Sequence, residues 1–442
     1  MRGRRDHVLP LFCLLAALLP PLTAAGAGAG PTVRGGLTLM PNAQLAAMSG
    51  RVRVAASPDG RRVYFIGGFD NRSGVAIFQR NATTGALSRG KGPESCIVTE
   101  IAASQCRKGP WLNNSFALAV SPDSQDVVVG SYAGSTGIAL YRRTPGGGLT
   151  YVPTGGVTGR GVSSSYDFAF SPDGKNVYAA EARNLGALLV LDRNPATGTL
   201  SEHAGATGCF ERSGHAGSES PPCSAVPNKT FSPSFVRVSP DGGTVVVYAG
   251  GFYVFKRDPA TGTLTLLGCQ IAQPTAPCVA LTPGIPTFPD DMAYAPDGST
   301  LIVVSTDSGT DDSRLLGRVD LLHVDPATGA VTETACIEDE VAGCNHDVKV
   351  PDGATAVAIS PDGQTAYIGG SLKLRAYRIG TTGLTPLAGM TACISADASK
   401  GCTHLGAAAV QPFDGFRSLT VTADGRSLYS AGEIGLAFAV SP

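Results

Sequence analysis

The chain has 442 residues, and its 34 Lys and Arg against 35 Asp and Glu give a formal net charge of −1. With only 16% charged residues and no basic block after the amino terminus, nucleic acid and acidic membrane surfaces are excluded as expected partners. The 57 glycines and 31 prolines supply turns, whereas Lys and Glu, which favour helices, are scarce. We therefore expect a β-rich globular protein.

Residues 1–27 have the composition of a secretory signal peptide. Three arginines precede an apolar stretch over residues 8–22, which Pro20 and Pro21 break near its end and small residues follow. The stretch is short for a membrane span, although an uncleaved anchor is the alternative interpretation. We predict that cleavage leaves residues 28–442 as a single domain without a membrane span, either secreted or periplasmic.

The segment Ser57-Pro58-Asp59-Gly60 lies between two strand-like stretches, residues 52–56 and 62–66, and is typical of a tight turn. Six further copies have their aspartates at Asp123, Asp173, Asp241, Asp297, Asp362 and Asp424. Seven copies spaced by about 50 to 70 residues indicate that nearly the whole chain is one internal repeat.

A second turn recurs after a third strand that ends in a basic residue, with its clearest copies at residues 194–200, 258–264 and 325–331. There are six of these turns against seven of the first kind. The chain ends after a third strand, and residues 34–40 resemble a turn end followed by a fourth strand. These complementary halves predict an all-β, seven-bladed β-propeller of four-stranded antiparallel blades, in which the N-terminal strand completes the last blade. An open β-solenoid is the main alternative.

The ten cysteines after the leader form five local pairs, each between a fourth strand and the next first strand. The pairs are Cys96 and Cys106, Cys209 and Cys223, Cys269 and Cys278, Cys336 and Cys344, and Cys393 and Cys402. An even count beside a secretory leader predicts disulfides that stiffen the inter-blade loops. Zinc is the competing interpretation, but CxxC pairs are lacking, and we expect neither a metal nor a cofactor.

Four sequons would accept glycans in a host that glycosylates, unless they occur by chance. They are Asn71, Asn81, Asn113 and Asn228.

In a propeller of this strand order the inter-blade loops share one face, here named the loop face. The two recurrent turns share the opposite face, the turn face. Near the mouth of the central channel, the starts of the innermost strands carry small or apolar residues except at Arg53, Asp167, Arg237 and Asp291. Charges there are costly unless paired or solvated, so the four residues form either a site for an anionic or polyhydroxyl ligand or two structural ion pairs. Four residues just upstream of these strands would extend the site: Asp290, Asp352, Asp414 and Arg417.

No nucleophile elbow, phosphate loop or HExxH motif is present, so no catalytic residue is assigned. Four histidines flank or lie within the cysteine loops, and we expect them on the loop face. They are His203, His215, His346 and His404.

The repeated "SPDG…VY" with "RDPATGTLT", clearest over residues 239–265, resembles the lactonase-type, YVTN-repeat family of seven-bladed propellers. The resemblance covers about residues 35–442 and implies the fold. Family members with lactonase or muconate-cyclising activity are associated with channel-mouth Arg, Glu and His residues, often in a PRH-like lead to an innermost strand. Here the corresponding stretches read SYDF, PDDM and PSFV, so the catalytic set is not carried over.

Three hypotheses follow. The leading one is a secreted, monomeric, disulfide-stapled propeller that binds a small ligand or an extracellular protein on its loop face. The second is a lactonase-like hydrolase in which Arg53 or Arg237 polarises the carbonyl and an aspartate directs water. The third is a structural envelope or matrix protein.

Overall fold

The computed structural model describes residues 34–40, 49–69, 72–99, 106–131, 137–158, 162, 164–182, 186–212, 222–282, 285–308, 315–338, 344–347, 350–381, 383–397, 401–405, 415–432 and 434–442. The proposed signal peptide, Asn71, His215 and Asp414 lie outside these residues.

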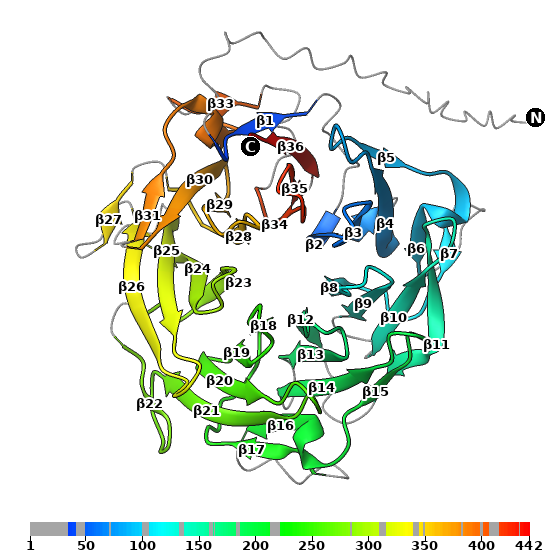
Figure 1. Cartoon of the computed structure of the whole chain (residues 1–442), viewed down its shortest axis with the longest axis vertical. Coiled ribbons are helices and arrows are strands. Elements are labelled where there is room, and N and C mark those ends of the chain that lie inside the picture. Colours follow the sequence, from blue (N-terminus) through cyan, green and yellow to red (C-terminus); the bar gives the residue numbers. More distant parts are fainter. Residues whose placement is uncertain are drawn as a thin grey trace, which may run out of the picture.

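Seven sheets surround one axis, and each contributes its first strand to the centre of the ring (Figure 1). Blade 1 comprises β2 (Ser49–Ala56), β3 (Arg62–Phe69), β4 (Arg72–Arg80), β5 (Leu87–Arg89), β6 (Cys96–Val98) and β7 (Arg107–Lys108). Blade 2 comprises β8 (Ser115–Val120), β9 (Asp126–Ser131), β10 (Ile138–Arg143) and β11 (Leu149–Val157). Blade 3 comprises β12 (Ser165–Phe170), β13 (Asn176–Glu181), β14 (Ala187–Arg193), β15 (Leu200–Glu202), β16 (Cys209–Arg212) and β17 (Ser224–Val226).

The remaining blades follow in chain order around the ring. Blade 4 comprises β18 (Phe235–Val238), β19 (Thr244–Tyr248), β20 (Gly251–Arg257), β21 (Leu264–Ile271) and β22 (Val279–Ala280). Blade 5 comprises β23 (Pro289–Tyr294), β24 (Thr300–Ser308), β25 (Leu315–Val324), β26 (Val331–Glu338) and β27 (Asn345–His346). Blade 6 comprises β28 (Ala356–Ile359), β29 (Thr365–Gly369), β30 (Lys373–Gly380), β31 (Gly383–Pro386), β32 (Cys393–Ser395) and β33 (Thr403–His404). The only helices among the described residues are three short 3₁₀ turns, η1 (Gly92–Glu94), η2 (Ala206–Gly208) and η3 (Met390–Ala392).

Blade 7 closes the ring with strands from both ends of the chain. It comprises β34 (Ser418–Val421), β35 (Ser427–Ala431), β36 (Leu436–Val440) and β1 (Leu37–Leu39). Strand β1 pairs antiparallel with β36, and Leu37 lies opposite Val440. The predicted propeller, its blade number and its closure by the N-terminal strand are confirmed.

The first recurrent turn has the hydrogen bonds that its residues predict. Ser57 Oγ donates to Asp59 Oδ1 at 2.5 Å, and the same oxygen accepts the N–H of Arg61 at 3.0 Å. Gly60 takes a φ of +68°, in the left-handed region that glycine adopts without strain. In blade 5, where Ala295 replaces the serine, Asp297 instead accepts from Thr300 Oγ1 at 2.7 Å.

The hydrophobic core lies between neighbouring blades, because alternate residues of each strand face opposite sides of the sheet. In β3, Val63 and Phe65 pack toward blade 7, whereas Tyr64 and Ile66 pack toward blade 2. All four side chains are fully buried.

All five predicted disulfides are present, with Cα–Cα distances of 4.6 to 4.9 Å. Each one joins an outer antiparallel strand to the segment that leads into a short, parallel fifth strand, such as β7 beside β6. The sequence did not predict these fifth strands. They cover the outer edge of five blades, where backbone groups would otherwise stay unpaired.

No helix in the described part of the chain is both long and apolar enough to span a membrane.

Candidate functional site

Side chains at the starts of the innermost strands bridge neighbouring blades around the axis. The inner edge of each of these strands has no partner strand, so its N–H groups need another acceptor. Asp167 Oδ2 accepts the N–H of Val236 at 3.1 Å, and Asp291 Oδ2 accepts the N–H of Val357 at 3.2 Å. Each aspartate thereby ties its own blade to the next one.

Three of the four predicted site residues meet in one ion triad. Arg237 in β18 lies between Asp167 in β12 and Asp291 in β23; its Nη2 donates to Asp291 Oδ1 at 2.8 Å and its Nη1 to Asp167 Oδ2. The same guanidinium donates to the carbonyls of Met292, at 2.5 Å, and Val236, at 2.8 Å. This geometry joins blades 3, 4 and 5 and matches the structural ion pairs that the sequence left open as the alternative.

The triad is not sealed from solvent, because 17% of the Asp167 side chain, 23% of Arg237 and 20% of Asp291 are exposed. Burial raises the pKa of Asp167, and the charge of Asp291 adds to the effect, while Arg237 opposes it. Burial would lower the pKa of Arg237, but the two carboxylates outweigh it and raise that pKa.

Arg53 and Asp290 lie outside the triad. Arg53 Nη1 donates to the carbonyl of Arg417 at 3.3 Å, which links blade 1 to blade 7. Asp290 Oδ2 accepts the N–H of Thr306 at 2.9 Å, and burial raises the pKa of its carboxyl. The positive charge of Arg53 acts on both Asp290 and Asp167 and favours their ionised forms.

A second set of inter-blade ion pairs lies on the turn face. The basic residue that ends a third strand reaches the turn aspartate of the preceding blade. The pairs are Arg80 with Asp424, Arg143 with Asp59, Arg193 with Asp123, and Arg257 with Asp173. Sequence reasoning noted the basic residues and the aspartates but did not pair them.

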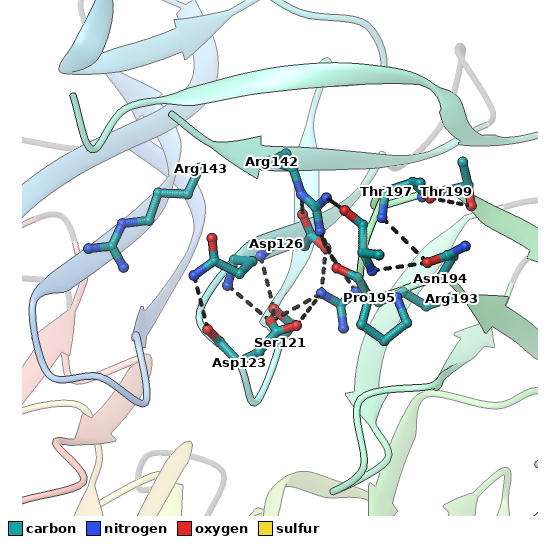
Figure 2. Close-up of polar contacts among 12 residues, drawn as sticks. Ser121, Asp123, Asp126, Arg142, Arg143, Arg193, Asn194, Pro195, Thr197 and Thr199 are labelled. Atoms are coloured by element: carbon teal, nitrogen blue, oxygen red, sulfur yellow. Dashed lines mark hydrogen bonds and ion pairs between the residues drawn. The ribbon is translucent and has the colours of Figure 1, made fainter. Parts of the chain in front are cut away.

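Figure 2 shows the pair whose arginine is the most deeply buried of the four. Arg193 donates from Nη2 to Asp123 Oδ2 at 2.7 Å and from Nε to Asp126 Oδ2 at 2.9 Å. Arg142 approaches Asp126 from the other side, with Nε 2.8 Å from Oδ1. Asp123, Asp126, Arg142 and Arg193 form an ion cluster that joins blades 2 and 3. Within it, neither Arg193 nor Asp126 exposes any side-chain surface.

His203 lies on the turn face, and its expected position on the loop face is wrong. Its Nδ1 is 3.0 Å from Asp192 Oδ1, and its Nε2 is 3.3 Å from Thr263 Oγ1 of blade 4. Strand β15 pairs with the turn-face end of β14 before the chain crosses to the cysteine loop, which places the histidine there. The contacts tie blade 3 to blade 4 beside a hollow of about 440 Å³ that Lys175, Asp192 and Thr261 help to line.

A buried acidic cluster surrounds Arg318 in blade 5. Its guanidinium is 2.7 Å from Asp320, 3.4 Å from Glu333 and 3.3 Å from Glu338. Asp320 is fully buried, and burial raises the pKa of its carboxyl to about 7, against the opposing effect of Arg318.

Glu333 also lies near the sulfur atoms of Cys336 and Cys344, within 4.8 Å. Those sulfurs are joined in a disulfide, so they offer no thiolate to a metal ion.

The described sequons differ in exposure. Asn81 and Asn113 are exposed, whereas Asn228 is half-buried and its amide donates to the hydroxyl of Tyr253 at 2.8 Å. A glycan on Asn228 would replace that hydrogen bond.

Neither the family models nor the curated proteins include a match to this chain. Among solved structures, it is similar to a protein from Lactobacillus plantarum, with 18% identity over 79% of this chain and 87% of that one and a TM-score of 0.53. It is similar to the periplasmic gluconolactonase of Pseudomonas aeruginosa, with 17% identity, coverage of 77% and 85%, and a TM-score of 0.52. A putative 6-phosphogluconolactonase from Bacteroides uniformis gives 16% identity, coverage of 78% and 86%, and a TM-score of 0.51. The predicted resemblance to lactonase-type propellers is thus confirmed at the level of the fold.

Proposed function

We propose that the chain is a secreted or periplasmic propeller that binds a small polyhydroxyl ligand on the loop face, at the axis of the ring. One observation carries the proposal. Asp167 uses Oδ2 for both Val236 and Arg237, while its Oδ1 meets no donor in the described part of the chain. A partly exposed carboxylate oxygen held this rigidly is a ready acceptor for a ligand hydroxyl.

The hydrogen bonds that Arg237 already makes favour a neutral ligand over an anion. Arg237 lies between the carboxylates of Asp167 and Asp291. Arg237 already donates to two carboxylates and two carbonyls, so little of its hydrogen-bonding capacity remains for an anionic ligand. Of the two ligand classes that the sequence predicted, the polyhydroxyl class is therefore the better fit.

Two further observations support the proposal. The similar structures include proteins named for gluconolactone chemistry, although at 16 to 18% identity this likeness concerns the fold alone. Five disulfides suit an oxidising compartment, which agrees with the leader. Mass spectrometry of the exported protein tests the compartment, since we expect the mature chain to begin near residue 28.

The test is titration calorimetry with D-sorbitol as the neutral probe and D-gluconate as its anionic counterpart. A ligand of about a dozen non-hydrogen atoms at about 0.3 kcal/mol each binds with a Kd on the order of 1 mM. We expect sorbitol to bind more tightly than gluconate. Asp167→Ala should weaken sorbitol binding about tenfold or more, because a hydrogen bond to a charged group is lost.

Asp241→Asn, at a turn aspartate on the opposite face, is the matched control and should bind sorbitol normally. Asp167→Asn replaces Asp167→Ala if the alanine variant does not fold. No saturable sorbitol binding to the folded parent protein, or equal binding by the Asp167 variants, contradicts the proposal.

Lactone hydrolysis is a second candidate, favoured by the raised pKa of Asp290 beside the charge of Arg53. Arg53 would polarise the lactone carbonyl while the Asp290 carboxylate takes a proton from the attacking water. The acyl C–O bond then breaks, and the ring oxygen leaves with a proton as a hydroxyl group. We expect acid release from D-glucono-1,5-lactone above the spontaneous rate, and its loss in Asp290→Asn and Arg53→Ala. Equal rates in both variants and the parent protein would reject this mechanism.

A further inference from the structure

A carboxylate, a histidine and a threonine are hydrogen-bonded in series on the turn face, between blades 3 and 4. His203 Nδ1 lies 3.0 Å from Asp192 Oδ1, and His203 Nε2 lies 3.3 Å from Thr263 Oγ1. An ionised carboxylate only accepts hydrogen bonds, so Nδ1 carries the proton and Nε2 of the neutral ring is an acceptor. The hydroxyl of Thr263 therefore donates to His203. In this arrangement the histidine can take the proton of a hydroxyl that attacks an acyl group.

Neighbouring side chains fix the directions of these hydrogen bonds. Arg257 Nη2 donates to Asn176 Oδ1 at 2.8 Å, which turns the amide Nδ2 of Asn176 toward Asp192 Oδ1, 3.0 Å away. Asn176 and Arg257 are both buried, so the carboxylate is held from within the blades. At the other end, Thr261 Oγ1 donates to Thr263 Oγ1 at 2.9 Å, which leaves the proton of Thr263 for the imidazole.

The carboxylate of Asp192 is a feature of blade 3 and not of the repeat. Asp192 in β14 lies opposite Asn176 in β13. The corresponding positions of the other six blades carry no acid, and they are Gln79, Arg142, Lys256, His323, Arg378 and Ala439. Since six blades fold without this carboxylate, the architecture of a blade does not require its pairing with His203.

These side chains lie beside the hollow of about 440 Å³ on the turn face. Asp192 lines the hollow, and so does Thr261, the hydrogen-bonding neighbour of Thr263. Thr263 is half-buried and 14% of the His203 side chain is exposed, so solvent reaches both. The exposed Lys175 also lines the hollow, and its ammonium group can stabilise the negative charge that develops on a carbonyl oxygen under attack. The hollow thus combines room for a small ester with a cation on its wall.

We propose that this site transfers acyl groups from small esters, with Thr263 as the nucleophile and His203 as the general base. Thr263 Oγ1 forms a bond to the carbonyl carbon, and its proton passes to His203 Nε2. The C–O bond to the alcohol then breaks, the electron pair stays on the alcohol oxygen, and the histidine gives its proton to that oxygen. Water next attacks the acyl carbon, its proton passes through His203 to the Thr263 oxygen, and the carboxylic acid is released. Asp192 positions the imidazole and stabilises its positive charge.

The experiment uses p-nitrophenyl acetate, which releases p-nitrophenolate and leaves its acetyl group on the nucleophile until water removes it. We expect release above the spontaneous rate and, by mass spectrometry after rapid acid quenching, an acetyl group on the peptide that contains Thr263. Thr263→Val should abolish both, whereas Thr263→Ser should keep both. His203→Gln, whose amide can still bond to Asp192 and Thr263 but takes no proton, should slow the release about 100-fold or more.

The matched control is Thr199→Val, which should leave the release unchanged. Thr197 and Thr199 form the same threonine pair in the corresponding turn of blade 3, with their Oγ1 atoms 3.0 Å apart (Figure 2). No histidine contacts Thr199 in the described part of the chain. Circular dichroism shows which variants are folded.

Three outcomes would overturn the proposal. They are release at the parent rate from folded Thr263→Val or His203→Gln, an acetyl group found only on other residues, and no release above the spontaneous rate. The site lies on the face opposite the axial one, so these results do not depend on whether sorbitol binds at the axis.

Discussion

Replacing Arg193 by alanine should destabilise the propeller strongly, because this residue is the centre of the ion cluster that joins blades 2 and 3. Its guanidinium donates to Asp123, Asp126 and the carbonyl of Gly174, the last at 2.8 Å. Asp123 is 37% exposed and can be solvated after the substitution, so its loss contributes little. Asp126 has no exposed side-chain surface and would keep only Arg142 as a cationic partner.

Breaking a buried ion pair by removing one partner costs about 3–5 kcal/mol. Since Arg142 still offsets part of the Asp126 charge, we expect the lower end, a loss of about 3 kcal/mol in the free energy of unfolding. Adding Asp126→Asn to Arg193→Ala should recover part of that loss, because the uncompensated charge disappears. Guanidinium denaturation followed by circular dichroism measures both effects.

The matched control is Arg34→Ala, which breaks an equivalent contact to the turn aspartate Asp362. Those side chains are 59% and 41% exposed, so the cost should be below about 1 kcal/mol. If Arg193→Ala lowers the free energy of unfolding no more than Arg34→Ala does, the reasoning that burial makes this ion cluster important for stability is refuted.

Three further predictions concern the remaining charges and the disulfides. All seven turn aspartates have lowered pKa values, through the hydroxyl, backbone and arginine hydrogen bonds that offset their partial burial. Their stabilisation is present above the unfolded pKa and is lost on acidification, so the melting temperature should fall below about pH 4; a constant melting temperature there would contradict this. Asp320, whose pKa is raised to about 7, has the opposite pH dependence. Its contribution to the free energy of unfolding is complete below about pH 4 and is lost toward pH 7, by up to about 1.4 kcal/mol per pH unit. Asp320→Asn should remove this slope from a pH series of denaturation curves, and an unchanged slope would assign it to other groups. Replacing both Cys269 and Cys278 by serine should cost about 2–3 kcal/mol without unfolding the protein, and denaturation midpoints equal to those of the parent would show that this loop needs no bridge.

The architecture was predictable because its signals are local and repeated. Each copy of the turn around residues such as Ser57 and Asp59 contains its own hydrogen-bonding groups, so counting copies gives the number of blades. The disulfides are similarly local, and the half-units at the two termini complement each other. None of these inferences needed to know how neighbouring blades lie side by side.

The site was predicted only in part, because it depends on contacts between blades. The sequence identified Arg237 and Asp167 as unusual charges on innermost strands, but it left open whether they pair. Arg80 meets Asp424 across 344 positions of sequence, a contact that only the ring closure creates. His203 was expected on the wrong face. It lies close to a cysteine loop in the sequence, but this closeness does not show that β15 pairs with the turn-face end of β14.

The central claim is that a polyhydroxyl ligand binds on the loop face, at the axis of the ring, and donates a hydrogen bond to Asp167 Oδ1. Titration of D-sorbitol into the parent protein and into Asp167→Ala tests it most directly. We predict saturable binding with a Kd on the order of 1 mM in the parent protein, and binding at least about tenfold weaker in a folded Asp167→Ala variant. Equal sorbitol binding by the two proteins, or no binding by either, would contradict the claim.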